Sequence, residues 1–79
     1  MDIVDNKDRR GQYTGSLSIK TNKPHGNGRM EYADLTYEGR WLDGDWSGFG
    51  KLVDKKTGDT YQGGFLDNTK HGLGIIQYA

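Results

Sequence analysis

The sequence predicts an all-β repeat protein assembled from antiparallel β-hairpins. The first observation is a repeat: Tyr13, Tyr37 and Tyr61 recur at intervals of 24 residues, and a glycine follows each of them two positions later. The second is an alternation of side-chain character with a period of two from Gln12 onward, which is typical of strands, while no window shows helical periodicity. Self-similarity at a period of roughly 20 to 50 residues indicates a repeat architecture, in which each unit buries its face on its neighbours.

Each unit begins with Tyr-x-Gly-x and a large apolar residue and then reaches a Gly-x-Gly. The stretch Tyr37–Gly50, YEGRWLDGDWSGFG, is the clearest copy, with a looser copy at Tyr13–Gly28 and a closer one at Tyr61–Gly74. The region before the repeats is charged without a clear period, so we expect it to be flexible. The predicted organisation is a charged tail at 1–11 and a repeat region at 12–79, alone or within a longer array, with units at about 12–35, 36–59 and 60–79.

Each unit is predicted to fold as a hairpin, since the residues between its two strands have turn chemistry. In the second unit the strands are expected to pair symmetrically about a turn at Asp43–Gly48. Trp41 then faces Gly50. In the same register Gly39 faces Leu52. Directly opposed residues lie on one face roughly 5 Å apart, so each glycine is predicted to give a bulky side chain room to lie flat over the backbone.

Composition limits the classes of function. The chain has 79 residues with 32% hydrophobic residues and a mean hydropathy of −0.94, so its stability must come from stacking like units rather than from a thick core. The 11 basic residues balance 11 acidic ones, which leaves no general field to attract nucleic acid. The chain has no cysteine, no apolar run of membrane-span length and no signal-peptide segment. We therefore expect a cytoplasmic module.

No arrangement of residues predicts catalysis, a cofactor or a bound metal. The chain lacks a cysteine nucleophile and a serine–histidine–acid set at a supporting spacing. The Gly-x-Gly doublets lack the strand–glycine–helix context of a phosphate loop. His25 and His71 occupy equivalent positions in different units, so turn hydrogen bonding explains them better than metal ligation. Asp43 and Asp45 lack the remaining ligands of a calcium loop. We expect a protein that is not an enzyme.

The units closely resemble the MORN (membrane occupation and recognition nexus) repeat family, whose unit reads Tyr-x-Gly-x-aromatic-x-Asp/Asn-Gly, then Gly-x-Gly, then an apolar-x-aromatic exit. YEGRWLDG…GFGKL matches best, YQGGFLDN…HGLGIIQY nearly as well, and YTGSLSIK…HGNGRMEY has Leu17 in place of the aromatic residue. The resemblance covers residues 12–79. It implies a meander of stacked hairpins that forms one elongated, curved sheet with an aromatic groove. It also implies a binding or scaffolding role, through protein partners, self-association or membranes.

The aromatic face is the first candidate site, because a single sheet has nothing on its far side to cover it. One interpretation is stacking that only holds the sheet together. The other is a groove for a partner segment, since tyrosine and tryptophan are favoured at protein interfaces. We expect both roles together. The residues of this predicted groove are Tyr13, Tyr32, Tyr37, Trp41, Tyr61, Phe65 and Tyr78.

The opposite face is the second candidate site, because it is less polar than a solvent-facing surface should be. In the predicted register Leu42 faces Phe49. Leu66 likewise faces Leu73. These pairs either pack the ends of the loops or form a patch for dimerisation or docking. Trp46, in a turn, is either a further exposed anchor or packs over its own loop. The candidate second interface therefore comprises Leu42, Trp46, Phe49, Leu66 and Leu73.

A small basic edge supports an alternative function in which the chain recognises acidic phospholipid headgroups. Its candidate contacts are Lys51, Lys55, Lys56 and Lys70. Such recognition usually needs about 4 to 8 clustered cations, and Asp54 and Asp59 dilute this cluster. We therefore predict a protein-interaction or scaffolding module that binds a peptide, a helix or a second copy of itself. Peripheral membrane binding is the alternative, and membrane or cytoskeletal association is left open.

Overall fold

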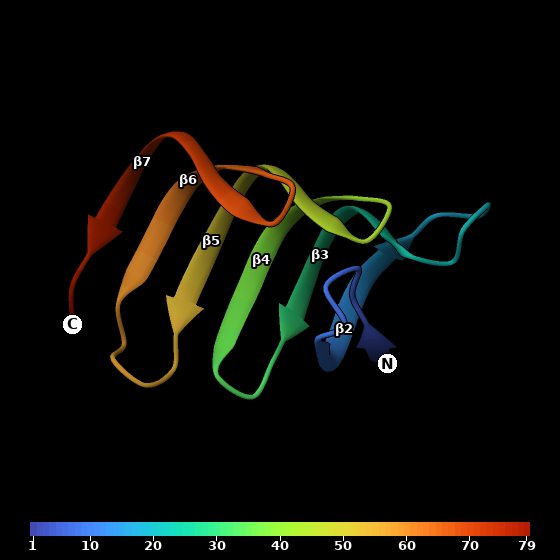
Figure 1. The fold of residues 1–79 in the computed structure, drawn as a ribbon, viewed down its shortest axis with the longest axis horizontal. Coiled ribbons are helices and arrows are strands. Elements are labelled where there is room, and N and C mark those ends of the chain that lie inside the picture. Colours follow the sequence, from blue (N-terminus) through green and yellow to red (C-terminus); the bar gives the residue numbers. More distant parts are fainter.

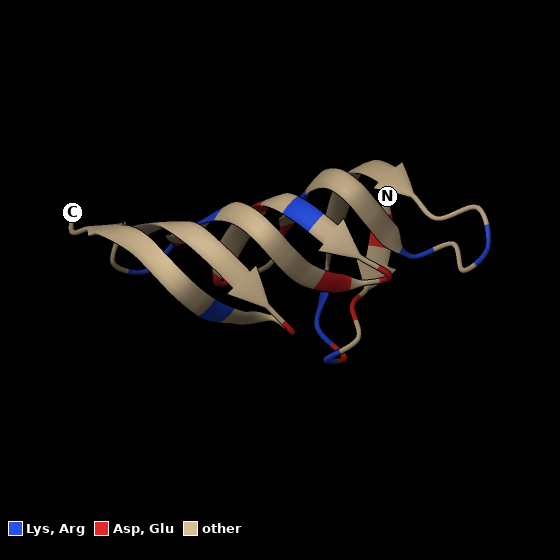
Figure 2. Ribbon diagram, turned by 90° about the horizontal axis from the view of Figure 1, so that it is seen from above, with Lys and Arg blue, Asp and Glu red and all other residues tan.

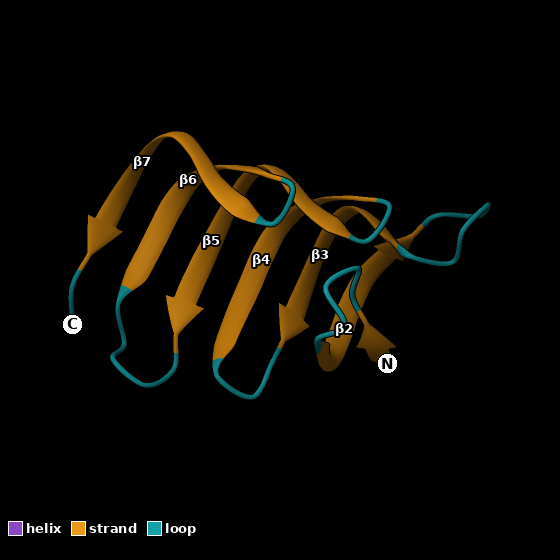
Figure 3. Cartoon of the chain, viewed as in Figure 1, coloured by secondary structure: helices purple, strands orange, loops and turns teal.

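The protein folds as one antiparallel sheet of seven strands, shown in Figure 1. The computed structural model describes residues 1–79, and Figure 3 shows strands and loops only. The strands are β1 (Asp2–Val4), β2 (Arg10–Leu17), β3 (Pro24–Glu31), β4 (Leu35–Leu42), β5 (Asp45–Asp54), β6 (Thr60–Leu66) and β7 (Thr69–Gln77). They lie side by side in sequence order, and the backbone measures 37 × 25 × 18 Å. The prediction of an all-β meander of hairpins in one sheet is confirmed.

The β4–β5 and β6–β7 hairpins close with two-residue turns. Asp43 and Gly44 have φ angles of 46° and 91°, and Asp67 and Asn68 have φ angles of 51° and 64°. Positive φ at both central residues defines a type I′ turn, whose twist matches that of the paired strands. The turn of the second unit is therefore shorter than the sequence predicted.

The predicted register of the hairpin arms is wrong. Gly39 pairs with Gly50 rather than with Leu52, and Trp41 pairs with Trp46. Between these two pairs lies a bulge, in which one residue of β4 stands opposite three residues of β5. The β2–β3 and β6–β7 hairpins contain the same irregularity. The bulge changes the register inside each hairpin. Strand pairs counted outward from the turn are therefore wrong for the residues beyond the bulge.

The observed register aligns one glycine from each of six strands in a row across the sheet. This glycine row consists of Gly15, Gly28, Gly39, Gly50, Gly63 and Gly74. A Cβ atom at Gly50 would lie 2.5 Å from the Tyr37 hydroxyl oxygen and 2.7 Å from ring carbons Cε1 and Cζ. Glycine thus gives an aromatic ring room over the backbone, as predicted. The ring comes from a diagonal position, however, and not from the residue directly opposite.

Each hairpin bends at its bulge, and its tip folds over the face that carries the aromatic residues, here called the inner face. Gly26, Gly48 and Gly72 occupy equivalent positions in the bulges, with φ angles of 86°, 78° and 75°. These values lie in the left-handed region that glycine adopts without a steric penalty. Figure 1 shows the turn ends of the hairpins curling over. Neighbouring tips are also joined, since Gly44 N–H donates to the Pro24 carbonyl at 2.8 Å.

The core is a continuous stack of large side chains on the inner face. Its eight buried members are Tyr13, Met30, Tyr32, Tyr37, Trp41, Trp46, Tyr61 and Phe65. The expectation of an uncovered aromatic face is therefore wrong for these residues. The folded tips cover the face from one side, and rings from successive units fill the space between them.

The first eleven residues do not form the predicted flexible tail, because β1 covers Asp2–Val4, β2 begins at Arg10, and a short loop joins them. β1 pairs with the start of β2, and the loop between them lies against the inner face. The buried Asp5 carboxylate accepts hydrogen bonds from the Arg9 backbone N–H at 2.9 Å and the Tyr32 hydroxyl at 2.6 Å. The Arg9 guanidinium carbon lies 4.6 Å from the centroid of the Trp46 ring. This loop covers the inner face beside the first unit.

Candidate interaction surfaces

Three aromatic rings surround Tyr37 at the centre of the inner face. Trp46 stacks on Tyr37 with a centroid separation of 4.7 Å and an interplanar angle of 5°. Trp41 and Phe65 meet the same ring edge-on, at 5.2 and 5.0 Å. The hydroxyl donates to the Arg40 carbonyl at 2.8 Å, and burial raises its pKa above the ordinary tyrosine value. Each such ring pair stabilises by about 0.5–1.5 kcal/mol beyond area burial, so this centre holds the hairpins together.

A buried chain of hydrogen bonds connects the second unit to the N-terminal loop. Trp46 Nε1–H donates to the Tyr32 hydroxyl oxygen at 3.2 Å, and that hydroxyl donates to Asp5. Burial, followed by the hydrogen bond to Asp5, raises the pKa of Tyr32. The assignment of Trp46 to an exposed second interface is therefore wrong. No repeat signal could have placed it in the core, because the equivalent positions hold Pro24 and Lys70.

Tyr78 differs from the other six residues of the predicted aromatic groove, because it is 75% exposed. It borders a hollow of about 210 Å³ between β5, β6 and β7. Tyr61 and Lys70 border the same hollow, and the Lys70 ammonium lies 5.0 Å from the centroid of the Tyr61 ring. The third unit is thus less completely filled than the second.

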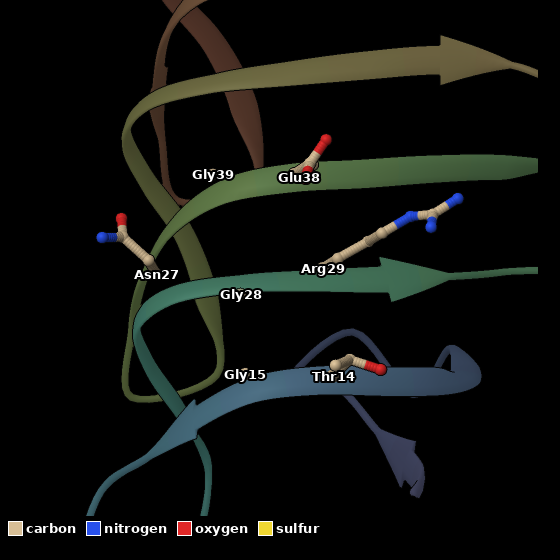
Figure 4. Close-up of a pocket in the computed structure, with 7 residues that line it drawn as sticks. All are labelled: Thr14, Gly15, Asn27, Gly28, Arg29, Glu38 and Gly39. Carbon is tan, nitrogen blue, oxygen red and sulfur yellow. The ribbon is translucent and has the colours of Figure 1, made fainter.

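The opposite face, here called the outer face, is hollowed above the glycine row. A hollow of about 540 Å³ lies over β2–β4. In Figure 4 Asn27 lies on one side of the glycine row, and Thr14, Arg29 and Glu38 lie on the other. Arg29 lies opposite Glu38, and Glu38 lies opposite Lys51 on the next strand. Opposite charges alternate along this side, so this part of the outer face is polar.

Towards β7 the same face becomes apolar. Phe49, Leu73 and Ile75 are 66%, 96% and 74% exposed. They border a hollow of about 300 Å³ whose floor includes Gly63 and Gly74 of the glycine row. We call Phe49, Leu73 and Ile75 the outer patch. It contains two of the predicted second-interface residues, Phe49 and Leu73, beside two glycines of the row.

Leu42 and Leu66 are exposed, but their predicted pairing is wrong. They pair with Asp45 and Thr69, next to the two-residue turns. Leu42 nevertheless borders a hollow together with Phe49, because the bulge brings these two side chains near each other. Leu66 stands apart from the hollow of the outer patch.

The structure does not gather the four predicted headgroup lysines on one surface. Lys51 belongs to the outer face, whereas the Lys70 ammonium lies over Tyr61 on the inner face. Lys55 and Lys56 belong to the turn between β5 and β6. Figure 2 shows the lysines and arginines at separate places along the ribbon.

No three histidine, aspartate or glutamate side chains come together as a candidate metal site. Asp43 N–H donates to His25 Nδ1 at 3.3 Å, which is the turn hydrogen bonding predicted for this histidine. His71, at the equivalent position in the third unit, is exposed. The structure contains no helix long and apolar enough to cross a membrane.

Comparison with known protein families agrees with the three hairpins. The family model described as MORN repeat matches residues 21–36, 37–56 and 61–79, which together make up more than half of the chain. The first match begins at Thr21, so β2, the loosest part of the repeat, lies outside it. Repeats of this kind are generally associated with protein or membrane interactions. The chain belongs to the MORN-repeat family.

Proposed function

We propose that this protein is a non-enzymatic protein-interaction module whose partner binds the outer patch. The observation that carries the proposal is the exposure of three large apolar side chains, Phe49, Leu73 and Ile75, around one hollow. Contiguous exposed apolar surface of this kind is typical of interaction sites. The family association with protein or membrane interactions supports the same role.

The rest of the molecule favours the outer face over the inner one. On the inner face the aromatic rings are buried against one another, so they offer a partner little area. On the outer face glycines of the row line both hollows, so a partner can reach the backbone there. A partner segment that crosses the strands would meet apolar side chains near β7 and the charged Arg29–Glu38–Lys51 series near β3 to β5. We therefore expect an extended segment with a large apolar residue at one end and charged residues at the other.

The experiment is selection from a displayed peptide library, followed by affinity measurement on outer-face variants. Burying one side chain of this size contributes about 1.5–3 kcal/mol before association costs are subtracted. Phe49→Ser and Leu73→Ser should therefore each weaken binding by roughly tenfold or more. Leu66→Ser is the matched control, since it removes an exposed leucine outside the hollow. Equal affinity of all three folded variants would place the partner elsewhere.

Recognition of acidic phospholipids is less well supported, because Lys51 and Lys70 lie on opposite faces and Lys55 and Lys56 lie in a turn. Co-sedimentation with anionic vesicles across a salt series separates the two functions. Binding of the protein to vesicles at low salt that is lost at high salt would indicate electrostatic membrane binding. If the Phe49→Ser variant bound the vesicles equally well, the result would count against the outer patch as the binding surface. Light scattering on the same samples tests whether the outer patch pairs two copies of the chain.

A further inference from the structure

We propose that the hollow between β5, β6 and β7 on the inner face binds a partner's tryptophan side chain. The inference rests on the proposed interaction function, but it concerns a different surface from the outer patch. It follows from comparing two units of the same chain, one of which fills this position with an indole while the other places the flexible Lys70 side chain there beside a hollow.

The two positions are equivalent in the fold. Tyr37 and Tyr61 start the second and third units, and Trp46 and Lys70 follow them at the same distance along the chain. Trp46 pairs with Trp41, and Lys70 pairs with Phe65, which occupies the same place as Trp41 in its own hairpin. The third unit therefore carries a lysine where the second unit carries an indole.

The filled position shows what surrounds an indole here. The ring of Trp46 stacks on Tyr37 at 4.7 Å, and its Nε1–H donates to the Tyr32 hydroxyl at 3.2 Å. The guanidinium carbon of Arg9 lies 4.6 Å from the indole centroid. An indole in this fold thus has an aromatic floor, a hydrogen-bond acceptor at its N–H and a cation over its face.

The equivalent position of the third unit has an aromatic floor and a nearby carboxylate, and the Lys70 side chain lies where the second unit has its indole. Tyr61 takes the place of the Tyr37 floor. It is 6% exposed, with the Lys70 ammonium 5.0 Å from its centroid, so an indole reaches the ring only by displacing Lys70. Asp54 occupies the strand position equivalent to Tyr32, and it borders the hollow with a carboxylate that can accept a hydrogen bond. The hollow measures about 210 Å³. Leu52, Ile76 and the exposed Tyr78 also border it.

The chemistry of the hollow favours an indole over other occupants. Lys70 already places a positive charge over Tyr61, so a second cation would be repelled. Asp54 accepts backbone hydrogen bonds from Lys56 and Thr57 through Oδ1, which leaves Oδ2 for another donor. An aliphatic side chain would cover this carboxylate without a hydrogen bond, which is costly. An indole supplies both the flat face and the donor, and the displaced ammonium can rest on the bound ring.

The test uses N-acetyl-tryptophanamide as the probe and the methyl signals of Leu52 and Ile76 in the full chain as the readout. The probe should shift both signals upfield in a saturable manner. N-acetyl-leucinamide and N-acetyl-argininamide serve as matched probes and should bind at least roughly tenfold more weakly. Stronger binding of the arginine probe, or equal binding of all three, would overturn the assignment.

Lys70→Trp tests the equivalence of the two positions, since it should fill the hollow from within. It is expected to raise Tm and to abolish the methyl shifts caused by the tryptophan probe. Lys56→Trp is the control, because it adds an indole in the neighbouring turn and should leave the titration unchanged. A lower Tm for Lys70→Trp, or an undiminished titration, would contradict the proposal.

The result is separable from that for the outer patch. Phe49→Ser should leave the tryptophan titration intact, because Phe49 does not border this hollow. Lys70→Trp should likewise leave peptide binding at the outer patch intact, because Lys70 does not border that hollow. Failure of one site therefore does not imply failure of the other.

Discussion

Substitution of Gly50 by alanine tests the account of the glycine row most directly. Gly50 has an ordinary negative-φ backbone, so alanine brings no strain of its own there. Its Cβ would lie 2.5 Å from the Tyr37 hydroxyl oxygen and 2.7 Å from two ring carbons. The ring cannot move aside freely, because Trp41, Trp46 and Phe65 pack around it.

The size of the effect follows from these contacts. Overpacking of a filled core costs about 1–3 kcal/mol. Displacement of the hydroxyl from the Arg40 carbonyl leaves a buried polar group unsatisfied, which adds about 1–3 kcal/mol. We expect a total destabilisation of about 2–6 kcal/mol, and a fall in Tm of at least about 8 °C for a chain of this size. Urea and thermal unfolding followed by circular dichroism measure both quantities.

Gly72→Ala is the matched control. Gly72 has a φ angle of 75°, and a Cβ atom there would meet nothing within 4 Å, so its substitution brings backbone strain without a clash. That strain costs about 1–2 kcal/mol. Adding Tyr37→Phe to Gly50→Ala removes the nearest clashing atom, so the double variant should be more stable than the sum of the single effects by at least about 0.5 kcal/mol. If Gly50→Ala lowers the free energy of unfolding by no more than Gly72→Ala does, the packing of the Tyr37 ring does not require glycine at position 50.

Three further predictions concern the inner face. Trp46→Ala should lower the free energy of unfolding by about 3–5 kcal/mol, as expected for a large buried ring, and urea unfolding measures it. Asp5→Ala should cost about 1–3 kcal/mol because it leaves the Tyr32 hydroxyl without its acceptor; iodide quenching should also show greater access to Trp46. Since burial raises the folded-state pKa of Tyr32 and Tyr37, their contribution to stability is complete below the ordinary tyrosine pKa of 10.0 and is lost as the pH rises above it. As the pH is raised, the tyrosinate absorbance of the protein should therefore rise later than that of free tyrosine until the protein unfolds. Titration of all tyrosines near pH 10.0 in the folded protein would refute this.

The sequence predicts the strands and the repeat because both depend on local spacing. Tyr37, Gly39 and Trp41 alternate within one strand, and that alternation requires no knowledge of the partner strand. The register depends on the partner. The predicted register of β4 and β5 is wrong because the bulge places two extra residues of β5 opposite Arg40. In the sequence, these two residues look the same as two extra residues in the turn.

The candidate sites were predicted less well, because exposure depends on contacts between units. Trp46 is buried through Tyr32, and Asp5 reaches Tyr32 from 27 residues earlier in the chain. Neither contact has a periodic signal. Phe49 and Leu73 were assigned to the second face from a period of two, which does not depend on the register of the partner strand, and both side chains are exposed.

The bulges that follow the glycine row form a crease across the sheet. Since it crosses β2 to β7 at one level, every hairpin folds over at the same height. Only the two-residue spacing between the first tyrosine of each unit and the glycine that follows it must then be kept constant. The segments beyond the crease are free to differ in length, as the tips at residues 18–23 and 43–44 do, and so are the connections at 32–34 and 55–59. A protein built on such a crease can vary the loops along both margins of its sheet without disturbing the stacked rings between them.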